Sequence, residues 1–256
     1  MAFSGNGEDW IIVGASPDLR QQIQQSPRLW PRTSGRDSPI AGVVLIGGDV
    51  DAIAGLLVLR ERQSLTVYAP QPMLDLLDAN GIFGVLDPSV VRRVALRPAE
   101  PVPCGGGLTL TLLTMPGKVP LYMESRNATE PEPGPNYAAL LQANGRSAVV
   151  APACAEITES VRAQLRAADL LFFDGTLFTD DEMIAAGLGQ KTGRRMGHVP
   201  VSGAGGTLEG LADLPGRRIL LHINNTNPIL LSDSPERRQV EAAGFEVAYD
   251  GMEVRL

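Results

Sequence analysis

Several features that mark particular classes of protein are scarce or missing in this sequence of 256 residues. Its two cysteines, Cys104 and Cys154, stand far apart, which excludes a disulfide framework and a Cys-x-x-Cys zinc knuckle. The formal net charge of -7 argues against a general nucleic-acid binder, because such proteins normally carry a basic surface. No apolar run approaches the length that crosses a membrane, and residues 1–9 lack the basic start and apolar core of a secretory signal. The composition therefore predicts a cytoplasmic globular protein whose partners are neither nucleic acid nor membrane.

Histidine is scarce as well. The chain has 2 histidines, His198 and His222, and each stands beside glycine or asparagine in a loop or at the end of an apolar run. A single histidine in such a place is more often structural than functional. Its meaning depends on which other side chains come to the same place.

The stretch that organises the chain is residues 41–59. The run from Val43 to Ile46 is apolar and rich in β-branched residues, which predicts a strand buried on both faces. Two glycines follow, and leucines at helical spacing then predict a helix. Asp49 and Asp51 therefore lie between the end of a buried strand and the start of a helix. Helix capping is the simpler interpretation of these carboxylates, and a divalent-cation site is the alternative.

The second half of the chain repeats this arrangement twice. The predicted strand from Leu170 to Phe173 ends on Asp174, and the predicted strand from Arg218 ends on His222. If these strands are neighbours of the central one, their polar ends converge on one place. Imidazole and carboxylate donors with open positions suit Fe(II), Mn or Zn. The sequence therefore offers a candidate metal site made of Asp49, Asp51, Asp174 and His222.

The remaining pattern predicts a β-rich α/β protein with helices packed outside two sheets. We expect further strands over residues 10–13, 65–68, 90–96, 108–114, 119–123, 137–142, 147–151 and 245–249. We expect helices over residues 16–25, 71–79 and 207–211, the last capped by Thr207, and others that start near Thr158, Asp181 and Ser234. The strands in the middle follow one another without helices, which favours antiparallel pairing. Residues 124–136 and 193–198 are predicted loops, and Asp250-Gly251 is predicted to turn into a closing hairpin.

Four motifs resemble one family closely: Gly48-Asp-Val-Asp51, Thr192-Gly-Arg-Arg-Met-Gly-His198, His222-Ile-Asn-Asn-Thr-Asn-Pro228 and Asp233-Ser-Pro-Glu-Arg237. They resemble the PqqB family of pyrroloquinoline quinone (PQQ) biosynthesis proteins, and the resemblance covers essentially the whole chain. It implies a single domain over residues 1–256 with the α/β fold of the metallo-β-lactamase superfamily, a four-layer αββα sandwich. It also implies an iron-dependent hydroxylase that uses dioxygen on the tyrosine moiety of a peptide-derived precursor.

The resemblance assigns roles to residues of this chain. The expected metal ligands are Asp49, Asp51, Asp174 and His222, with Asp174 in the place of a bridging carboxylate. His198 and Asp174 are the expected catalytic residues, with His198 as a proton carrier, and substrate contacts are expected from Asn224, Asn225 and Arg195. Fe(II) is the expected metal, Zn the alternative, and a site without metal the third case. Other PQQ biosynthesis enzymes are expected partners.

Two departures from the family keep other functions open. The family motif continues Asp-His, whereas this chain reads Asp51-Ala52, so one imidazole ligand is absent. A metal-deficient pseudoenzyme that binds or carries PQQ or its precursor is therefore the main alternative. A metal-dependent hydrolase is a weaker one, because the chain lacks a His-x-His motif. The chain also starts after the glycine run and cysteine-rich knuckle of the family. From this we expect a missing first strand, an exposed sheet edge and self-association into a homo-oligomer.

Overall fold

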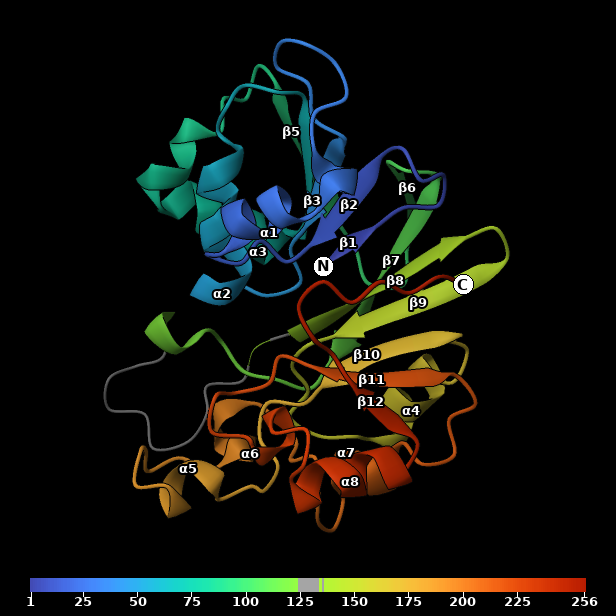
Figure 1. The fold of residues 1–256 in the computed structure, drawn as a ribbon. Helices are drawn as coiled ribbons and strands as arrows, with labels where there is room; N and C mark the ends of the chain where they lie inside the picture. Colours follow the sequence, from blue (N-terminus) through green and yellow to red (C-terminus); the bar gives the residue numbers. More distant parts are fainter. Residues whose placement is uncertain (124–133, 135) are drawn as a thin grey trace. The chain divides into compact units, whose positions relative to one another are not determined.

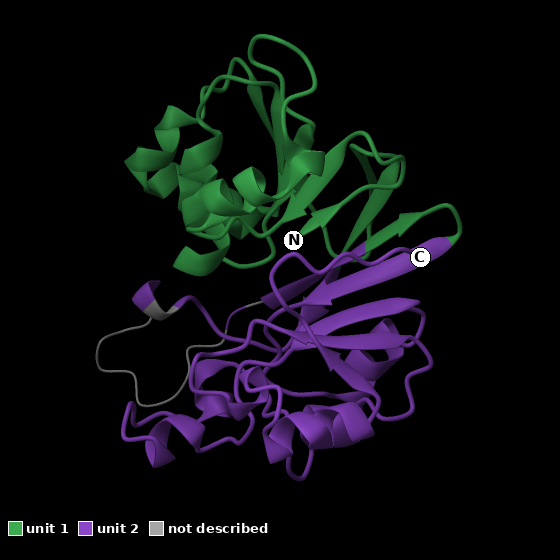
Figure 2. Cartoon of the chain, viewed as in Figure 1, with its two compact units in different colours: residues 1–112, 141–145 green, residues 113–140, 146–256 purple. Residues whose placement is uncertain are grey.

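The computed structural model describes residues 1–123, 134 and 136–256 and contains two β-sheets (Figure 1). It divides into two compact units, residues 1–112 with 141–145 and residues 113–140 with 146–256 (Figure 2). The single domain predicted over residues 1–256 stays a prediction, since each unit is compact by itself. The predicted loop over residues 124–136 lies almost wholly outside the described residues.

The first sheet belongs to the first unit and has five strands in chain order. They are β1 (Ala2–Phe3), β2 (Trp10–Val13), β3 (Ile40–Val44), β4 (Leu65–Pro70) and β5 (Val91–Leu96). β1 is antiparallel to β2, and the other neighbours are parallel. The strand predicted from the apolar run Val43 to Ile46 is therefore present as β3, although β3 starts and ends earlier than that run.

Helices connect the parallel strands, because a parallel pair needs a crossover rather than a tight turn. They are α1 (Leu19–Gln25), α2 (Val50–Ile53) and α3 (Gln71–Ala79), with 3-10 turns over Pro27–Leu29, Ala54–Leu59 and Gly81–Val85. Ile12, Leu56, Val67 and Leu77 are buried in one cluster that joins strand and helix side chains. This cluster is the core of the first unit.

The second sheet has seven strands in the order β12-β11-β10-β9-β8-β7-β6. They are β6 (Pro101–Cys104), β7 (Leu108–Met115), β8 (Asn136–Ala143), β9 (Arg146–Ala151), β10 (Leu170–Asp174), β11 (Arg217–Leu221) and β12 (Phe245–Val247). β9 to β12 run parallel, whereas β6 and β7 are antiparallel. The α-helices of the second unit, among its described residues, are α4 (Glu159–Leu165), α5 (Glu182–Ala185), α6 (Gly193–Met196), α7 (Thr207–Gly210) and α8 (Pro235–Ala242).

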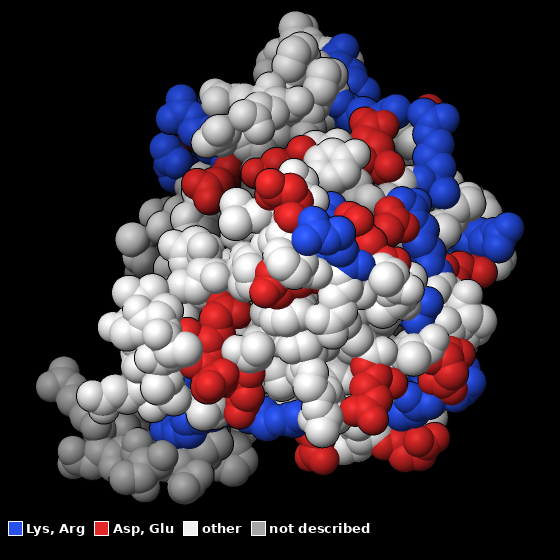
Figure 3. Space-filling view, turned by 60° about the horizontal axis from the view of Figure 1, so that its bottom comes forward, with Lys and Arg blue, Asp and Glu red and all other residues white. Residues whose placement is uncertain are grey.

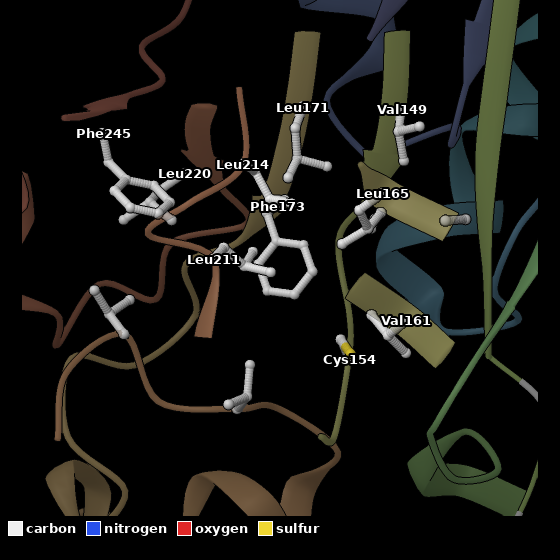
Figure 4. Close-up of a cluster of buried hydrophobic side chains, with 14 of the residues drawn as sticks. Val149, Cys154, Val161, Leu165, Leu171, Phe173, Leu211, Leu214, Leu220 and Phe245 are labelled. Atoms are coloured by element: carbon white, nitrogen blue, oxygen red, sulfur yellow. The ribbon is translucent and has the colours of Figure 1, made fainter. Parts of the chain in front are cut away.

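The core of the second unit fixes β10 and β11 in place (Figure 4). Phe173 of β10 and Leu220 of β11 are fully buried in one cluster with Val161 and Leu165 of α4. Full burial of one such side chain stabilises a fold by about 1.5–3 kcal/mol. The register pairs Phe173 with Leu220 and Asp174 with Leu221. The carboxyl ends of these two strands are thus held side by side by well-packed neighbours.

Some predicted elements of the middle region were wrong. Residues 119–123 are not a strand; the chain forms a single 3-10 turn, Leu121–Met123, closed by the bond from Met123 N to Pro120 O. Proline at position 120 has no N–H for a ladder, which explains the turn. β5 pairs with β4 in parallel, so antiparallel pairing holds for β6 and β7 but not for β5.

Two predictions near the end of the chain were also wrong. α7 is capped by Gly206, and Thr207 is its first helical residue. Asp250 and Gly251 form a turn but no hairpin, because β12 pairs in parallel with β11 and residues 252–256 form no strand. Parallel pairing continues to Ala248, whose N–H bonds to Leu220 O.

The surface shown in Figure 3 carries acidic and basic side chains intermixed. Ion pairs of the described residues include Arg217 with Glu246 and Arg162 with Asp213. Among the described residues, none of the helices has both the length and the apolar character that a membrane crossing needs.

Candidate metal centre

Three predicted site residues come together in the second unit. Asp174, His198 and His222 each offer a ligand atom, and these atoms lie within 4.8 Å of one another. Asp174 is fully buried, His198 is half-buried and His222 is exposed. The cluster therefore reaches from the core to the surface.

The ends of β10 and β11 position the first and last of these residues. Asp174 is the final residue of β10 and pairs with Leu221, the residue directly before His222. Gly175 allows this close approach, because a Cβ atom there would lie 2.9 Å from Leu220 Cβ and 3.1 Å from Leu221 O. Any larger residue would push the two strand ends apart.

His222 has a strained backbone with φ of 57°, in the left-handed region that non-glycine residues rarely adopt. Such a conformation costs about 1–3 kcal/mol and persists where the surroundings fix it. Two backbone bonds do so here: Gly175 N donates to Leu221 O at 2.8 Å, and Asn224 N donates to Thr176 O at 3.0 Å. The chain around His222 is thus tied to the chain after Asp174.

His198 follows directly after α6, a capped helical turn that replaces most of the predicted loop over residues 193–198. Thr192 accepts a hydrogen bond from Arg195 N at the start of α6, and Gly197 ends the helix with φ of 91°. His198 N then donates to Gly193 O at 2.9 Å. The two glycines of this motif are a first helical residue and a left-handed C-cap. The sequence of this motif is compatible with a loop and with a helical turn. Thr192, a typical N-cap residue, was the signal for the helical turn.

The hydroxyl of Thr176 lies at the centre of the cluster. Its Oγ1 is 2.6 Å from Asp174 Oδ1, 3.0 Å from His198 Nδ1 and 2.9 Å from His222 Nδ1. Asp174 Oδ1 also accepts from Thr176 N, while Oδ2 accepts from Cys154 N and lies 2.8 Å from His198 Nδ1. The rings of His198 and His222 are stacked, with centroids 5.3 Å apart.

These neighbours keep Asp174 ionised. Burial acts to raise the pKa of the carboxyl, but the charge and hydrogen bond of His198, the charge of His222 and the hydrogen bond of Thr176 outweigh it, so the pKa is lowered. By contrast, burial raises the pKa of the Cys154 thiol to about 12. Its sulfur donates to Glu156 O at 3.1 Å. Cys154 is therefore a protonated core residue that contributes its backbone N–H to the site.

The other predicted ligands lie in the first unit. Asp49 is the N-cap residue of α2 without a side-chain capping bond, and Asp51 lies in the first turn of that helix. Both are exposed, and their participation in the same site as His222 stays a prediction. Ala52, the position of the expected lost ligand, packs against the core cluster of the first unit.

The predicted substrate contacts have different surroundings. Asn224 Nδ2 bonds to Thr226 Oγ1 at 2.8 Å and to Met183 Sδ at 3.2 Å, which ties its loop to α5. Asn225 is exposed, and Arg195 is half-buried on α6. No contact with a substrate is shown for any of them, so their roles stay predictions.

Sequence reasoning missed two residues that hold the site together. Thr176 bridges all three members of the cluster, and the buried Asn227 donates from Nδ2 to Gly175 O at 2.9 Å. The position of Thr176, two residues after the expected buried Asp174, could have predicted that its hydroxyl bonds to the carboxylate. Asn227 was one of three neighbouring amides, and sequence alone does not say which of them turns inward.

Comparisons with known proteins give a consistent result. Residues 9–223 match the family model of the beta-lactamase superfamily domain. Coenzyme PQQ synthesis protein B of Gluconacetobacter diazotrophicus is 54% identical, over 99% of this chain and 86% of the relative. The namesake protein of Rhizobium meliloti is 50% identical, over 100% of this chain and 84% of the relative.

Solved structures agree with these relatives. The crystal structure of Zn(2+)-bound PqqB from Methylobacterium extorquens has a TM-score of 0.96 and 44% identity, and the match covers 100% of this chain and 86% of that one. YhfI of Bacillus subtilis, a metallo-beta-lactamase fold protein, has a TM-score of 0.68 and 14% identity, over 96% of this chain and 87% of that one.

Proposed function

Because this chain belongs to the PqqB family of the β-lactamase superfamily and so to PQQ synthesis, we propose that it acts there as an iron-dependent hydroxylase. The family and the metallo-β-lactamase fold predicted from the sequence are both confirmed. The proposed substrate is the tyrosine moiety of a peptide-derived precursor. One atom of dioxygen enters the ring as a hydroxyl, and the other leaves as water with two electrons and two protons from an external reductant.

The observation that carries the proposal is the donor set of the cluster. Two imidazoles, a carboxylate and open positions are typical of non-haem Fe(II) oxygenases. The residues present fit such a group, because His222 is exposed while Asp174 is buried and ionised beneath it. Zinc accepts similar donors, in line with the Zn(2+)-bound relative, so the donor set favours metal binding more strongly than it favours iron over zinc.

Each residue has a defined task in this proposal. His198 and His222 would hold the ion through ring nitrogens, and Asp174 supplies the negative charge of the set beside His198. A bound Fe(II) would supply the one-electron and dioxygen chemistry that no side chain can perform. With one ring nitrogen beside Asp174 and the other on the ion, His198 would have none left to carry a proton, so the proton carrier would have to be another group.

The test uses protein without a histidine tag, since the chain has only 2 histidines of its own. The metal-free protein is loaded anaerobically with Fe(II) or, as a redox-inert control, Zn(II), and the metal content per chain is measured. A tyrosine-containing precursor peptide, a reductant and dioxygen are then added, and mass spectrometry detects the gain of an oxygen atom.

We expect one ion per chain and an oxygen gain with Fe(II) but not with Zn(II). His222→Ala should abolish both metal binding and product. Asp169→Asn is the matched control, because it alters a carboxylate next to the other end of β10 that bonds to Ser147. Wild-type protein that binds iron yet transfers no oxygen to the peptide would refute the hydroxylase.

Ala52 supports a second candidate function, a protein that binds or carries PQQ or its precursor without turnover. Its methyl group packs against the core of the first unit where the family has an imidazole ligand. Calorimetry of the metal-free protein with PQQ tests this candidate. Tight binding by a protein that takes up no iron supports it, and absence of PQQ and precursor binding refutes it.

A further inference from the structure

Strand β5 forms an open end of the first sheet (Figure 1). Arg92 and Ala95 of this strand are exposed, and Arg93 and Val94 are half-buried. Among the described residues β5 pairs with β4 alone, so the other side of its backbone has no neighbouring strand. An unpaired strand edge is a template for pairing with another strand. The self-association expected from the sequence concerned a missing first strand, which is a different edge.

The other ends of the two sheets are less suited to pairing. β1 has only two residues, and β6 carries Pro101 and Pro103, which lack the N–H that a ladder needs. β12 has three residues, of which Phe245 is 2% and Val247 5% exposed. In the described part of the chain, β5 is therefore the accessible sheet edge.

The ladder with β4 shows which backbone groups of β5 point outward. Leu65 N of β4 donates to Val90 O, and the groups that face a neighbouring strand alternate along a strand. Residues 92, 94 and 96 thus face β4, whereas the N–H and C=O groups of Arg93 and Ala95 point away from it. The hydrogen bonds of the described residues give these four groups no partner.

The free groups have a definite end on each side. Val91 N donates to Asp87 O at 2.8 Å, and Arg97 O accepts from Glu100 N at 3.3 Å. These two flanking groups are therefore already occupied within the chain. Between residues 91 and 97, β5 offers a partner two N–H donors and two carbonyl acceptors, placed symmetrically about Val94.

This symmetry is that of a two-fold axis. In an antiparallel pair, two opposed residues exchange both of their N–H···O bonds. If Arg93 faces Ala95 of a second copy, and Ala95 faces its Arg93, all four groups of each copy are paired. A register centred on Arg93 would need Val91 N as a donor, and one centred on Ala95 would need Arg97 O as an acceptor, but both are occupied.

The side chains suit the same register. Arg93 is long and Ala95 is small, so each arginine lies opposite a methyl group rather than opposite another arginine. Arg93 is also ion-paired with Asp78 of α3, which offsets its charge. Val94 faces Val94 of the second copy, and β-branched side chains fit a pleated surface well. Another extended peptide would meet the same backbone groups, but this match of large to small side chains belongs to two copies of the chain.

We propose that β5 is a homodimer interface, in which the β5 strands of two copies pair antiparallel about a two-fold axis at Val94 and join their first sheets into one. Each copy donates its two free N–H groups, so four backbone hydrogen bonds hold the pair. Small interfaces are weak and transient, so the dimer forms at high protein concentration. The proposal depends neither on a metal nor on the reaction.

Sedimentation equilibrium over a wide range of protein concentrations tests the dimer. The average mass of the wild type should rise towards twice that of a single chain. Ala95→Pro removes an N–H that has no partner within the chain, and edge strands tolerate proline, so this variant should fold and stay monomeric. Ala95→Ser keeps the N–H and the small side chain and is the matched control, which should dimerise like the wild type. Circular dichroism checks that each variant is folded.

Cysteine cross-linking tests the register. In the proposed dimer the two copies of residue 94 form a non-hydrogen-bonded pair with Cα atoms about 4.5 Å apart, a distance that a disulfide spans. Val94→Cys should therefore give covalent dimers with oxidised glutathione. Arg92→Cys is the control on the same face of the strand, because its two copies lie four residues or about 13 Å apart. Burial raises the pKa of the Cys104 thiol to about 11 and that of Cys154 to about 12, so the native thiols react slowly.

Several results would overturn the proposal. One is a wild type that stays monomeric at every concentration, which would leave the edge to another extended peptide. Another is a folded Ala95→Pro protein that dimerises like the wild type. Cross-linking of Arg92→Cys as readily as Val94→Cys, or of neither, would show that the copies pair through another register or surface. The two cysteine variants decide the question even if Ala95→Pro does not fold.

Discussion

Replacing Asp174 by asparagine changes a single atom of the buried network and has a calculable effect. The amide keeps one oxygen and gains an NH2 group, so two of the four donors around this side chain lose their acceptor. On one side these are Cys154 N at 3.0 Å and His198 Nδ1 at 2.8 Å; on the other they are Thr176 N at 3.1 Å and Thr176 Oγ1 at 2.6 Å.

Of the two donors that bond to each oxygen of Asp174, one can become an acceptor and the other cannot. An imidazole or a hydroxyl can reverse and accept from the NH2 group, whereas a backbone N–H can only donate. Asp174→Asn therefore leaves one buried backbone N–H without a partner in either orientation, which costs about 1–3 kcal/mol. It also forces one histidine into the Nε2–H form, either His198 directly or a ring that receives the hydrogen of Thr176.

Urea unfolding and nuclear magnetic resonance of the two histidine rings measure these two effects on the same protein. We expect a loss of about 1–3 kcal/mol in the free energy of unfolding and one histidine that carries its hydrogen on Nε2. Asp169→Asn is the control: its carboxylate accepts from Ser147 N and Oγ, but its side chain is 34% exposed, so water replaces lost partners. It should lower stability less and leave both rings unchanged. A change in unfolding free energy within about 0.5 kcal/mol of the wild type, with both rings unaltered, would refute the reasoning.

Three further predictions concern other parts of the chain. Ala52→His should raise the amount of iron or zinc bound per chain, measured by elemental analysis; no gain would mean that the position is not a lost ligand of this site. Asn227→Ala should cost about 1–3 kcal/mol in urea unfolding, because its amide bonds are buried, whereas the exposed Asn225→Ala should cost almost nothing, and equal losses would contradict this contrast. The hydrogen bonds of Arg217 lower the pKa of Glu246, so their stabilisation is present above the unfolded pKa of Glu246 and disappears as pH falls through its folded pKa. A difference in unfolding free energy between wild type and Glu246→Gln that persists at low pH would disprove the linkage.

The ends of β10 and β11 were predictable from sequence for a simple reason. Their apolar runs, residues 170–173 and 219–221, are short and mostly buried, so the polar residue that ends each run is easy to locate. Parallel neighbours place their carboxyl ends together, which is why Asp174 and His222 lie close to each other. The expected convergence needed the two strands to be adjacent, which a single sequence does not reveal.

His198 could not be placed in this way. It is not at a strand end, and it reaches Asp174 because α6 ends in a left-handed Gly197 and the next residues bond to Cys154 O. These are contacts between segments far apart in sequence. The local motif predicted a loop, and only the fold shows that a capped helical turn carries the ring to the cluster.

Hydrogen bonds of the protein hold the cluster in order. Backbone bonds from Gly175 and Asn224 hold His222 in its left-handed conformation, and Asn227 secures the loop after β10. Thr176 then links the side chains, so backbone and ring orientations are fixed by buried bonds. A strained residue kept by such over-determined surroundings is typical of functional sites.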